Sequence, residues 1–150
     1  MRIKVYIMVE LKKRKKKKIS DSGRKYRWLN KFILIVEDER TNHMLIDLML
    51  RPTSARLMWA MDGKQAVEMC EENEDIDIVL MDIRLPKMNG YEATQAIRKF
   101  RPELPIVAQT AYVMEEEKHK VIEVGCNDLI TKPIKKEILL KKISKYIDTK

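Results

Sequence analysis

Apolar runs and amphipathic stretches alternate along the sequence from about residue 31 onward. Runs rich in Ile, Val and Leu, such as FILIV and IDIVLMD, are typical of strands buried on both faces of a sheet. Between these runs, apolar residues recur every three to four positions, a spacing that predicts helices. The predicted strands cover residues 32–36, 55–61, 76–82, 105–109 and 127–131. The predicted helices cover residues 40–50, 64–73, 91–100, 115–124 and 135–147.

The order of these elements determines the expected fold class, which is α/β. Five strand–helix repeats predict right-handed crossovers and a doubly wound, five-stranded parallel sheet with helices on both faces. Turn residues support the boundaries, with Asn89-Gly90 before the third helix and Gly125 after the fourth. The first helix carries Met44, Leu45, Leu48 and Met49 on one side. The last helix is expected to bury Leu139, Leu140, Ile143 and Ile147.

Charge divides the chain into two parts. Residues 1–31 hold 13 Lys or Arg against 2 acidic residues, whereas residues 32–150 hold 18 against 21. Seven consecutive basic residues occupy positions 12–18, and like charges at this density favour disorder. We therefore expect a largely disordered basic tail or linker over residues 1–30 and one domain over residues 31–150. An anchor for nucleic acid or anionic lipid is the alternative role of the tail, because polybasic segments bind phosphates.

Cysteine content and hydropathy restrict the cellular environment that we expect for the chain. Cys70 and Cys126 are the two cysteines, and their spacing is not that of a metal site. A reduced, cytoplasmic environment is the simplest interpretation. No apolar run approaches the roughly 20 residues that a membrane-spanning helix needs. The opening residues are too short an apolar stretch, and too charged, for a secretory signal.

Chemically distinctive side chains follow the predicted strands at their carboxyl ends. Glu37 and Asp38 follow the first strand, Asp82 ends the third, Thr110 follows the fourth and Lys132 follows the fifth. Parallel strands share this edge, where open α/β sheets bind ligands. Three carboxylates in one cleft repel one another unless a cation lies among them, and oxygen-only ligands favour Mg²⁺. A lysine ammonium and a threonine hydroxyl suit the oxygens of a phosphoryl group.

These positions, with the phrases ILIVEDE, VLMDIRLPKMNGYEA, PIVAQTA and ITKPI around them, resemble the receiver domain of two-component response regulators. The resemblance covers residues 31–148, and the sequence is most similar to those of receiver domains at the C-termini of hybrid sensor histidine kinases. It implies a flavodoxin-like sheet with strand order 2-1-3-4-5. It also implies a cytoplasmic signalling module, tethered to a membrane if the chain is part of a hybrid kinase.

The resemblance assigns roles to the acidic residues. Asp82 would be the phosphoacceptor, taking a phosphoryl group from a histidine kinase or a histidine phosphotransfer domain. Mg²⁺, or Mn²⁺, would be bound by Asp38, Asp82 and the backbone carbonyl of Arg84, with Glu37 acting mainly through water. The chain would then be a switch that catalyses only its own phosphorylation and dephosphorylation, not an enzyme with external substrates.

The resemblance also assigns roles around the phosphoryl group. Lys132 would pair with the phosphoryl oxygens, and its bond to Pro133 would be cis. Thr110 would move toward the phosphorylated Asp. Three residues would flank the site: Arg84, Ala111 and Tyr112. Of these, Arg84 and Tyr112 would affect the lifetime of the phosphoryl group. One departure is Leu129, which stands where the family usually has an aromatic residue that rotates on activation.

The residues themselves leave other functions open. A phosphorylation-independent docking module uses the same fold. An aspartyl-nucleophile phosphohydrolase is disfavoured, because its general acid belongs two residues after the nucleophile, where this chain has Arg84. Flavin binding is disfavoured by the acidic residues after the first strand. No DNA-reading motif is present, so the basic tail would bind polyanions only non-specifically. The resemblance also allows a homodimer.

Overall fold

The structure is a computed structural model that describes residues 25–111 and 114–148. Five parallel strands form one sheet in the order β2-β1-β3-β4-β5, which confirms the predicted topology. The strands are β1 (Phe32–Val36), β2 (Arg56–Ala60), β3 (Ile76–Asp82), β4 (Ile106–Thr110) and β5 (Asp128–Thr131). The helices are α3 (Arg40–Leu50), α4 (Gly63–Glu72), α5 (Gly90–Phe100), α6 (Glu115–Glu123) and α7 (Lys136–Ile147), and a short 3-10 turn η1 covers Arg51–Thr53.

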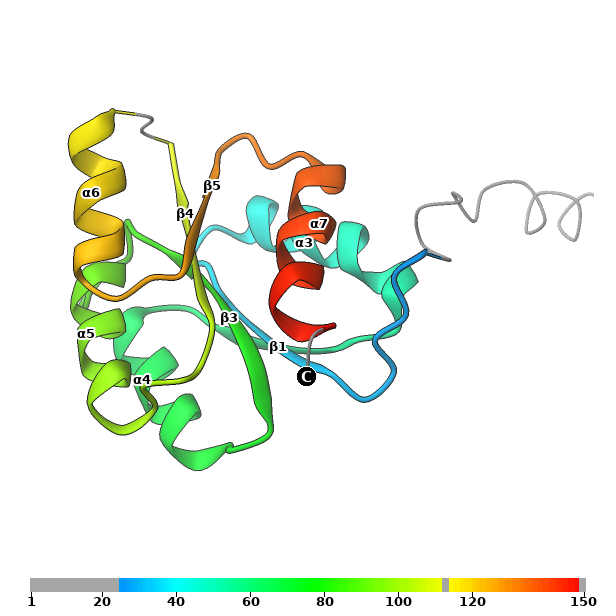
Figure 1. The fold of residues 1–150 in the computed structure, drawn as a ribbon, viewed down its shortest axis with the longest axis horizontal. Helices are drawn as coiled ribbons and strands as arrows, with labels where there is room; N and C mark the ends of the chain where they lie inside the picture. Colours follow the sequence, from blue (N-terminus) through cyan, green and yellow to red (C-terminus); the bar gives the residue numbers. More distant parts are fainter. Residues whose placement is uncertain (1–24, 112–113, 149–150) are drawn as a thin grey trace, which may run out of the picture.

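The helices cover the sheet on both faces (Figure 1). Helices α3 and α7 pack on one face with Ile46, Leu50 and Leu139, while α4, α5 and α6 pack on the other with Cys70 and Ile97. Side chains alternate along each strand, so both faces of the sheet need apolar residues. This double coverage explains why the central strands read as continuous apolar runs.

Helix α3 differs from the expected pattern. Its buried residues are Ile46 and Leu50, whereas Met44, Leu45 and Leu48 are 60%, 41% and 60% exposed. Apolar residues occupy most of the last seven positions of this helix, so the spacing alone could not decide which side faces the sheet. The consequence is an α3 apolar surface, formed by Met44, Leu45 and Leu48, that is open to solvent.

Trp28 fixes the chain just before β1. It is 2% exposed, its backbone N–H donates to the carbonyl of Thr53 at 2.7 Å, and its indole Nε1–H donates to Asp148 at 2.8 Å. The ordered fold therefore includes residues slightly before the predicted domain boundary at residue 31. Residues 1–24, which contain the basic run, lie outside the described residues, as does Tyr112. Within residues 25–111 and 114–148, the helices are too short or too polar to cross a membrane.

Candidate functional site

The acidic residues meet at the carboxyl edge of the sheet. Glu37 directly follows β1 and Asp82 ends β3, and these strands are neighbours. Glu37 and Asp82 are 1% and 4% exposed, while Asp38 is exposed to solvent. Each of the three offers a carboxylate oxygen, and these oxygens lie within 4.8 Å of one another. The structure therefore brings together the three side chains that the sequence placed at this edge.

Lys132 reaches into this cluster from the end of β5. Its Nζ donates to Glu37 Oε2 at 3.0 Å and to Asp82 Oδ2 at 2.6 Å. Its backbone N–H donates to the carbonyl of Thr110 at 2.8 Å, which fixes the start of the lysine side chain beside β4. The peptide bond between Lys132 and Pro133 is cis. The ammonium thus lies among the carboxylates and neutralises part of their charge.

Backbone amides hold the other oxygens of the two buried carboxylates. The N–H of Arg84 donates to Asp82 Oδ1 at 3.0 Å, and the N–H of Glu39 donates to Glu37 Oε1 at 3.0 Å. Each buried carboxylate therefore has one oxygen on a backbone amide and one on Lys132. These fixed partners orient the carboxylates before any ligand arrives, and a carboxylate oxygen has a second lone pair for a cation.

Burial and charge shift the pKa values in this cluster. Burial has the largest effect on the pKa of Asp82 and raises it, the hydrogen bond and charge of Lys132 lower it, and the charge of Glu37 raises it, so the net direction is upward. Burial lowers the pKa of Lys132, but its hydrogen bonds to Asp82 and Glu37 outweigh that effect, so the net direction is upward. The ammonium is thus held in its charged form, while burial makes the charged form of Asp82 less favourable than it is in water.

The loop after Asp82 depends on Gly90. The N–H of Gly90 donates to the carbonyl of Ile83 at 3.0 Å, and a Cβ at this glycine would lie 2.2 Å from the carbonyl oxygen of Asp82. Asn89 caps α5 through a capping box with Glu92. The sequence indicated Asn89-Gly90 only as a turn. It gave no sign that the glycine packs against the backbone of Asp82, because that contact depends on the path of the loop.

The other expected site residues also lie near this edge. Thr110 is 3% exposed at the end of β4, and its carbonyl accepts the Lys132 N–H. Ala111 and Arg84 are exposed. A pocket of about 600 Å³ opens beside the cluster, lined by Asp38, Ile83, Arg84, Leu85, Pro86, Asn89, Tyr91, Glu117 and Lys120. The Tyr91 hydroxyl donates to Glu117, and Lys120 lies 4.2 Å from the Tyr91 ring centre.

The donor set of the cluster fits Mg²⁺. Three carboxylates provide hard oxygen ligands. Asp38 is open to solvent, and this suits Mg²⁺ because the ion usually keeps several bound water molecules. Three carboxylate groups beside one ammonium group also leave an excess of formal negative charge, which favours a divalent cation. The acidic cluster is therefore a candidate metal site, with space beside it for a phosphoryl group.

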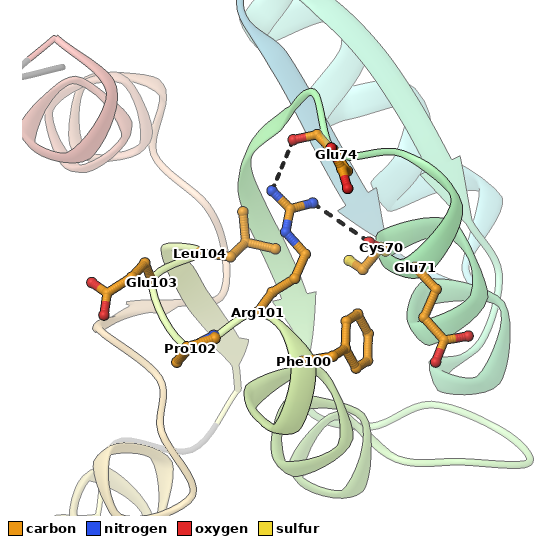
Figure 2. Close-up of a pocket in the computed structure, with 8 residues that line it drawn as sticks. All are labelled: Cys70, Glu71, Glu74, Phe100, Arg101, Pro102, Glu103 and Leu104. Atoms are coloured by element: carbon orange, nitrogen blue, oxygen red, sulfur yellow. Dashed lines mark hydrogen bonds between the residues drawn. The ribbon is translucent and has the colours of Figure 1, made fainter.

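A second pocket, of about 380 Å³, lies at the opposite edge of the sheet (Figure 2). Arg101 crosses it, and its guanidinium donates to the backbone carbonyls of Asn73 at 2.9 Å and of Glu74 and Ile76 at 3.0 Å. These bonds tie the end of α4 to the start of β3. Because the guanidinium is occupied by backbone carbonyls, we assign this pocket a structural role.

Comparisons with known proteins find related domains across most of the chain. The family model described as "Response regulator receiver domain" matches residues 33–144. A hybrid signal transduction histidine kinase of Dictyostelium discoideum is 37% identical over 128 residues, covering 77% of this chain and 7% of that protein. The chain thus spans a small part of this curated relative.

Two solved structures are similar across most of the chain. The receiver domain of the sensor histidine kinase PA1611 of Pseudomonas aeruginosa, with a magnesium ion in its active site cleft, is 36% identical with a TM-score of 0.74, covering 79% of this chain and 98% of that one. The receiver domain of Ssk1 of Saccharomyces cerevisiae, in complex with the histidine phosphotransfer protein Ypd1, is 31% identical with a TM-score of 0.74, covering 79% and 90%.

Proposed function

Because the chain belongs to the family of response regulator receiver domains of two-component signalling, we propose that Asp82 accepts a phosphoryl group from a phosphohistidine. The observation that carries this proposal is the position of the Asp82 carboxylate, which is buried at the sheet edge and bonded to the Lys132 ammonium that also bonds Glu37. In the transfer, the bond from phosphorus to the histidine nitrogen breaks and a bond from phosphorus to an Asp82 oxygen forms.

The residues around Asp82 supply charge stabilisation for this step. A loose transition state spreads negative charge over the phosphoryl oxygens, and Lys132 lies where that charge would develop. Mg²⁺, or Mn²⁺ in its place, would neutralise the remaining charge when held by Asp38, Asp82 and the Arg84 carbonyl, with Glu37 acting through water. The chain would act only on itself, as a switch.

Phosphorylation would then alter the loop that follows β4. The phosphoryl group adds about −1.5 to −2 charges to a small buried site. Thr110 would turn toward this group, and Ala111 and Tyr112 would follow because they are next in the chain. Leu129 supports a variation on the family's response: it packs, half-buried, against the core on the side of α4 to α6, in place of the usual aromatic residue.

The partner would be a histidine kinase or a histidine phosphotransfer domain. The α3 apolar surface supports this, because α3 begins directly after the acidic residues and so lies beside Asp82. We propose that the helices of the partner dock on this surface, with Arg40 and Lys135 at its border. Since the chain covers 7% of a hybrid kinase it resembles, the domain that includes Trp28 and the residues after it would be one domain of such a protein, and the basic residues before it would belong to a linker.

Intact mass spectrometry tests the proposed phosphorylation. The wild type, incubated with Mg²⁺ and acetyl phosphate or phosphoramidate, should gain one phosphoryl group. Asp82→Asn, and the wild type with EDTA, should gain none. No addition to the wild type, under donors that phosphorylate another receiver domain, would refute the proposal and favour a docking role that does not need phosphorylation.

A further inference from the structure

Gln109 is a buried polar residue without a partner in the described part of the chain. It lies on β4 and is 0% exposed, yet neither its side-chain Oε1 nor its Nε2 has a hydrogen bond to the described residues. Buried side-chain amides in proteins are nearly always hydrogen-bonded, because an unpaired amide loses its bonds to water without replacement. An exception next to a functional site therefore calls for an explanation.

The strand register places Gln109 in the same row as the acidic residues. Gln109 pairs with Asp82 of β3 on one side and with Ile130 of β5 on the other. Paired residues of neighbouring strands project from the same face of a sheet. Ile130 packs in the core under α3 and α7, as does Val107, two positions before Gln109. The amide therefore lies on that face, beside Asp82.

The side chain of Lys132 passes over this row. Lys132 follows β5, and its Nζ bonds to Asp82 of β3 and to Glu37 directly after β1. The side chain must therefore cross β4, which lies between β5 and β3. Its backbone N–H is fixed on Thr110, the residue after Gln109. An ammonium has three N–H donors, of which Glu37 and Asp82 take two in this state. The unpaired amide thus lies beneath a cation with donor capacity to spare.

We propose that Gln109 is a positioning residue for Lys132, and that its amide becomes hydrogen-bonded when the ion pair between Lys132 and Asp82 opens. This inference rests on the proposed phosphorylation of Asp82. When the phosphoryl group attaches, Lys132 moves from the carboxylate to a phosphoryl oxygen. Gln109 Oε1 then accepts a hydrogen bond from the ammonium, and Nε2 donates to the acyl oxygen of Asp82 that Lys132 has left.

This exchange makes Gln109 favour the phosphorylated state. In the resting state the unpaired amide lowers the stability of the domain, and in the phosphorylated state the same amide is paired. A group that interacts differently with two states shifts the equilibrium between them. Gln109 would therefore increase the response of the domain to phosphorylation and would keep Lys132 on the phosphoryl group.

Gln109→Met and Gln109→Leu test this role, because both have similar volume and no amide. Thermal midpoints are measured with EDTA, with Mg²⁺, and with Mg²⁺ and BeF₃⁻, a stable substitute for the phosphoryl group. Both variants should melt about 3–5 °C above the wild type in EDTA, because an unpaired buried amide has been removed. Their increase in midpoint with BeF₃⁻ should be smaller than that of the wild type by a similar amount. Gln95→Met, at an exposed position of α5, should change neither value.

Two outcomes separate the inference from the proposed function. If Gln109→Met shifts the midpoint equally in all three conditions, Gln109 has only a structural role and the inference is wrong. The half-life of phosphorylated Asp82 gives an independent readout, and it should change at least twofold in Gln109→Met but not in Gln95→Met. If the wild type gains no phosphoryl mass at all, the proposed function itself fails, and this result does not depend on the variants.

Discussion

Single residues at the carboxyl edge determine the chemistry of this domain. Asp82, Glu37 and Lys132 each have fixed hydrogen-bond partners, so the site is organised before any ligand binds. The cost is the burial of charged groups, which raises the pKa of Asp82 although Lys132 lowers it in part. Neighbouring residues with no charge, above all Gly90, maintain the backbone that keeps these groups in place.

Gly90→Ala should disrupt both stability and phosphorylation. The added Cβ would lie 2.2 Å from the carbonyl oxygen of Asp82, so the loop or the end of β3 must shift. We expect a loss of about 2–3 kcal/mol in the free energy of unfolding, measured with urea, and at least a tenfold slower reaction with acetyl phosphate. Asn89→Ala is the matched control, because it removes only the helix cap and should cost about 1 kcal/mol with little effect on the phosphorylation rate. Equal phosphorylation rates for Gly90→Ala and the wild type would contradict this account.

The buried thiol of Cys70 should make stability depend on pH in the alkaline range. Burial raises the pKa of Cys70 from 9.0 to about 11, although the charge of Arg101 lowers it in part. Because the folded pKa is higher than the unfolded one, the stabilisation is complete below pH 9.0 and is lost as the pH rises to about 11. This two-unit shift corresponds to about 2–3 kcal/mol.

Cys70→Ala isolates this contribution from the titration of lysines, which both proteins share. At pH 8 the variant should be about 1 kcal/mol less stable than the wild type, because the smaller side chain leaves a cavity. At pH 11 the difference in urea midpoint should disappear or reverse. A difference that stays constant between pH 8 and pH 11 would show that burial does not raise the pKa of Cys70 to this extent.

At the scale of elements, some features could be predicted from the sequence and others could not. Strands buried on both faces have continuous apolar runs, so β1 and β3 were predicted with their observed bounds. The convergence of Glu37, Asp82 and Lys132 followed from the parallel order of the strands. The buried side of α3 could not be predicted, because apolar residues occur on both sides of that helix. The unpaired amide of Gln109 could not be predicted from the sequence either, because hydrogen bonding depends on packing between strands.

The α3 apolar surface gives a prediction about partner docking. Leu48→Asp should slow phosphoryl transfer from a phosphorylated histidine phosphotransfer protein about tenfold or more, because a charge in an apolar contact costs binding energy. Leu48 is 60% exposed, so the substitution should leave stability nearly unchanged. Phosphorylation by acetyl phosphate should also be unchanged, since the small donor does not need α3.

Ile122→Asp is the matched control for this experiment. Ile122 is 55% exposed on α6, away from the proposed docking surface. It should not affect transfer from the protein donor. Arg40→Glu and Lys135→Glu, at the border of the surface, should slow transfer in the same selective way as Leu48→Asp. If the α3 variants slow both donors equally, the effect lies in the site and not in docking.

At the scale of the whole molecule, the two edges of the sheet have separate tasks. The carboxyl edge holds the acidic cluster and Lys132, while the amino edge is closed by Trp28 and by the backbone contacts of Arg101. Strand β3 connects the two edges, with Ile76 at the Arg101 contacts and Asp82 in the site. Changes at the carboxyl edge can therefore alter surface loops while the packing at the amino edge keeps the fold intact.

The basic segment should be separable from this fold. Residues 1–24 hold 10 Lys or Arg against 2 acidic residues, which equals the whole net charge of +8, so residues 25–150 are neutral overall. Deleting residues 1–24 should leave the thermal midpoint and the phosphorylation of Asp82 unchanged. Binding to heparin or duplex DNA, measured by fluorescence anisotropy, should be lost, since affinity for polyanions comes from counterion release by basic residues.

For the full chain, that affinity for polyanions should fall steeply between about 50 and 200 mM salt and should not depend on DNA sequence. Unchanged binding after the deletion would instead place the polyanion site on the folded domain, and a lower thermal midpoint would mean that the segment is part of the fold.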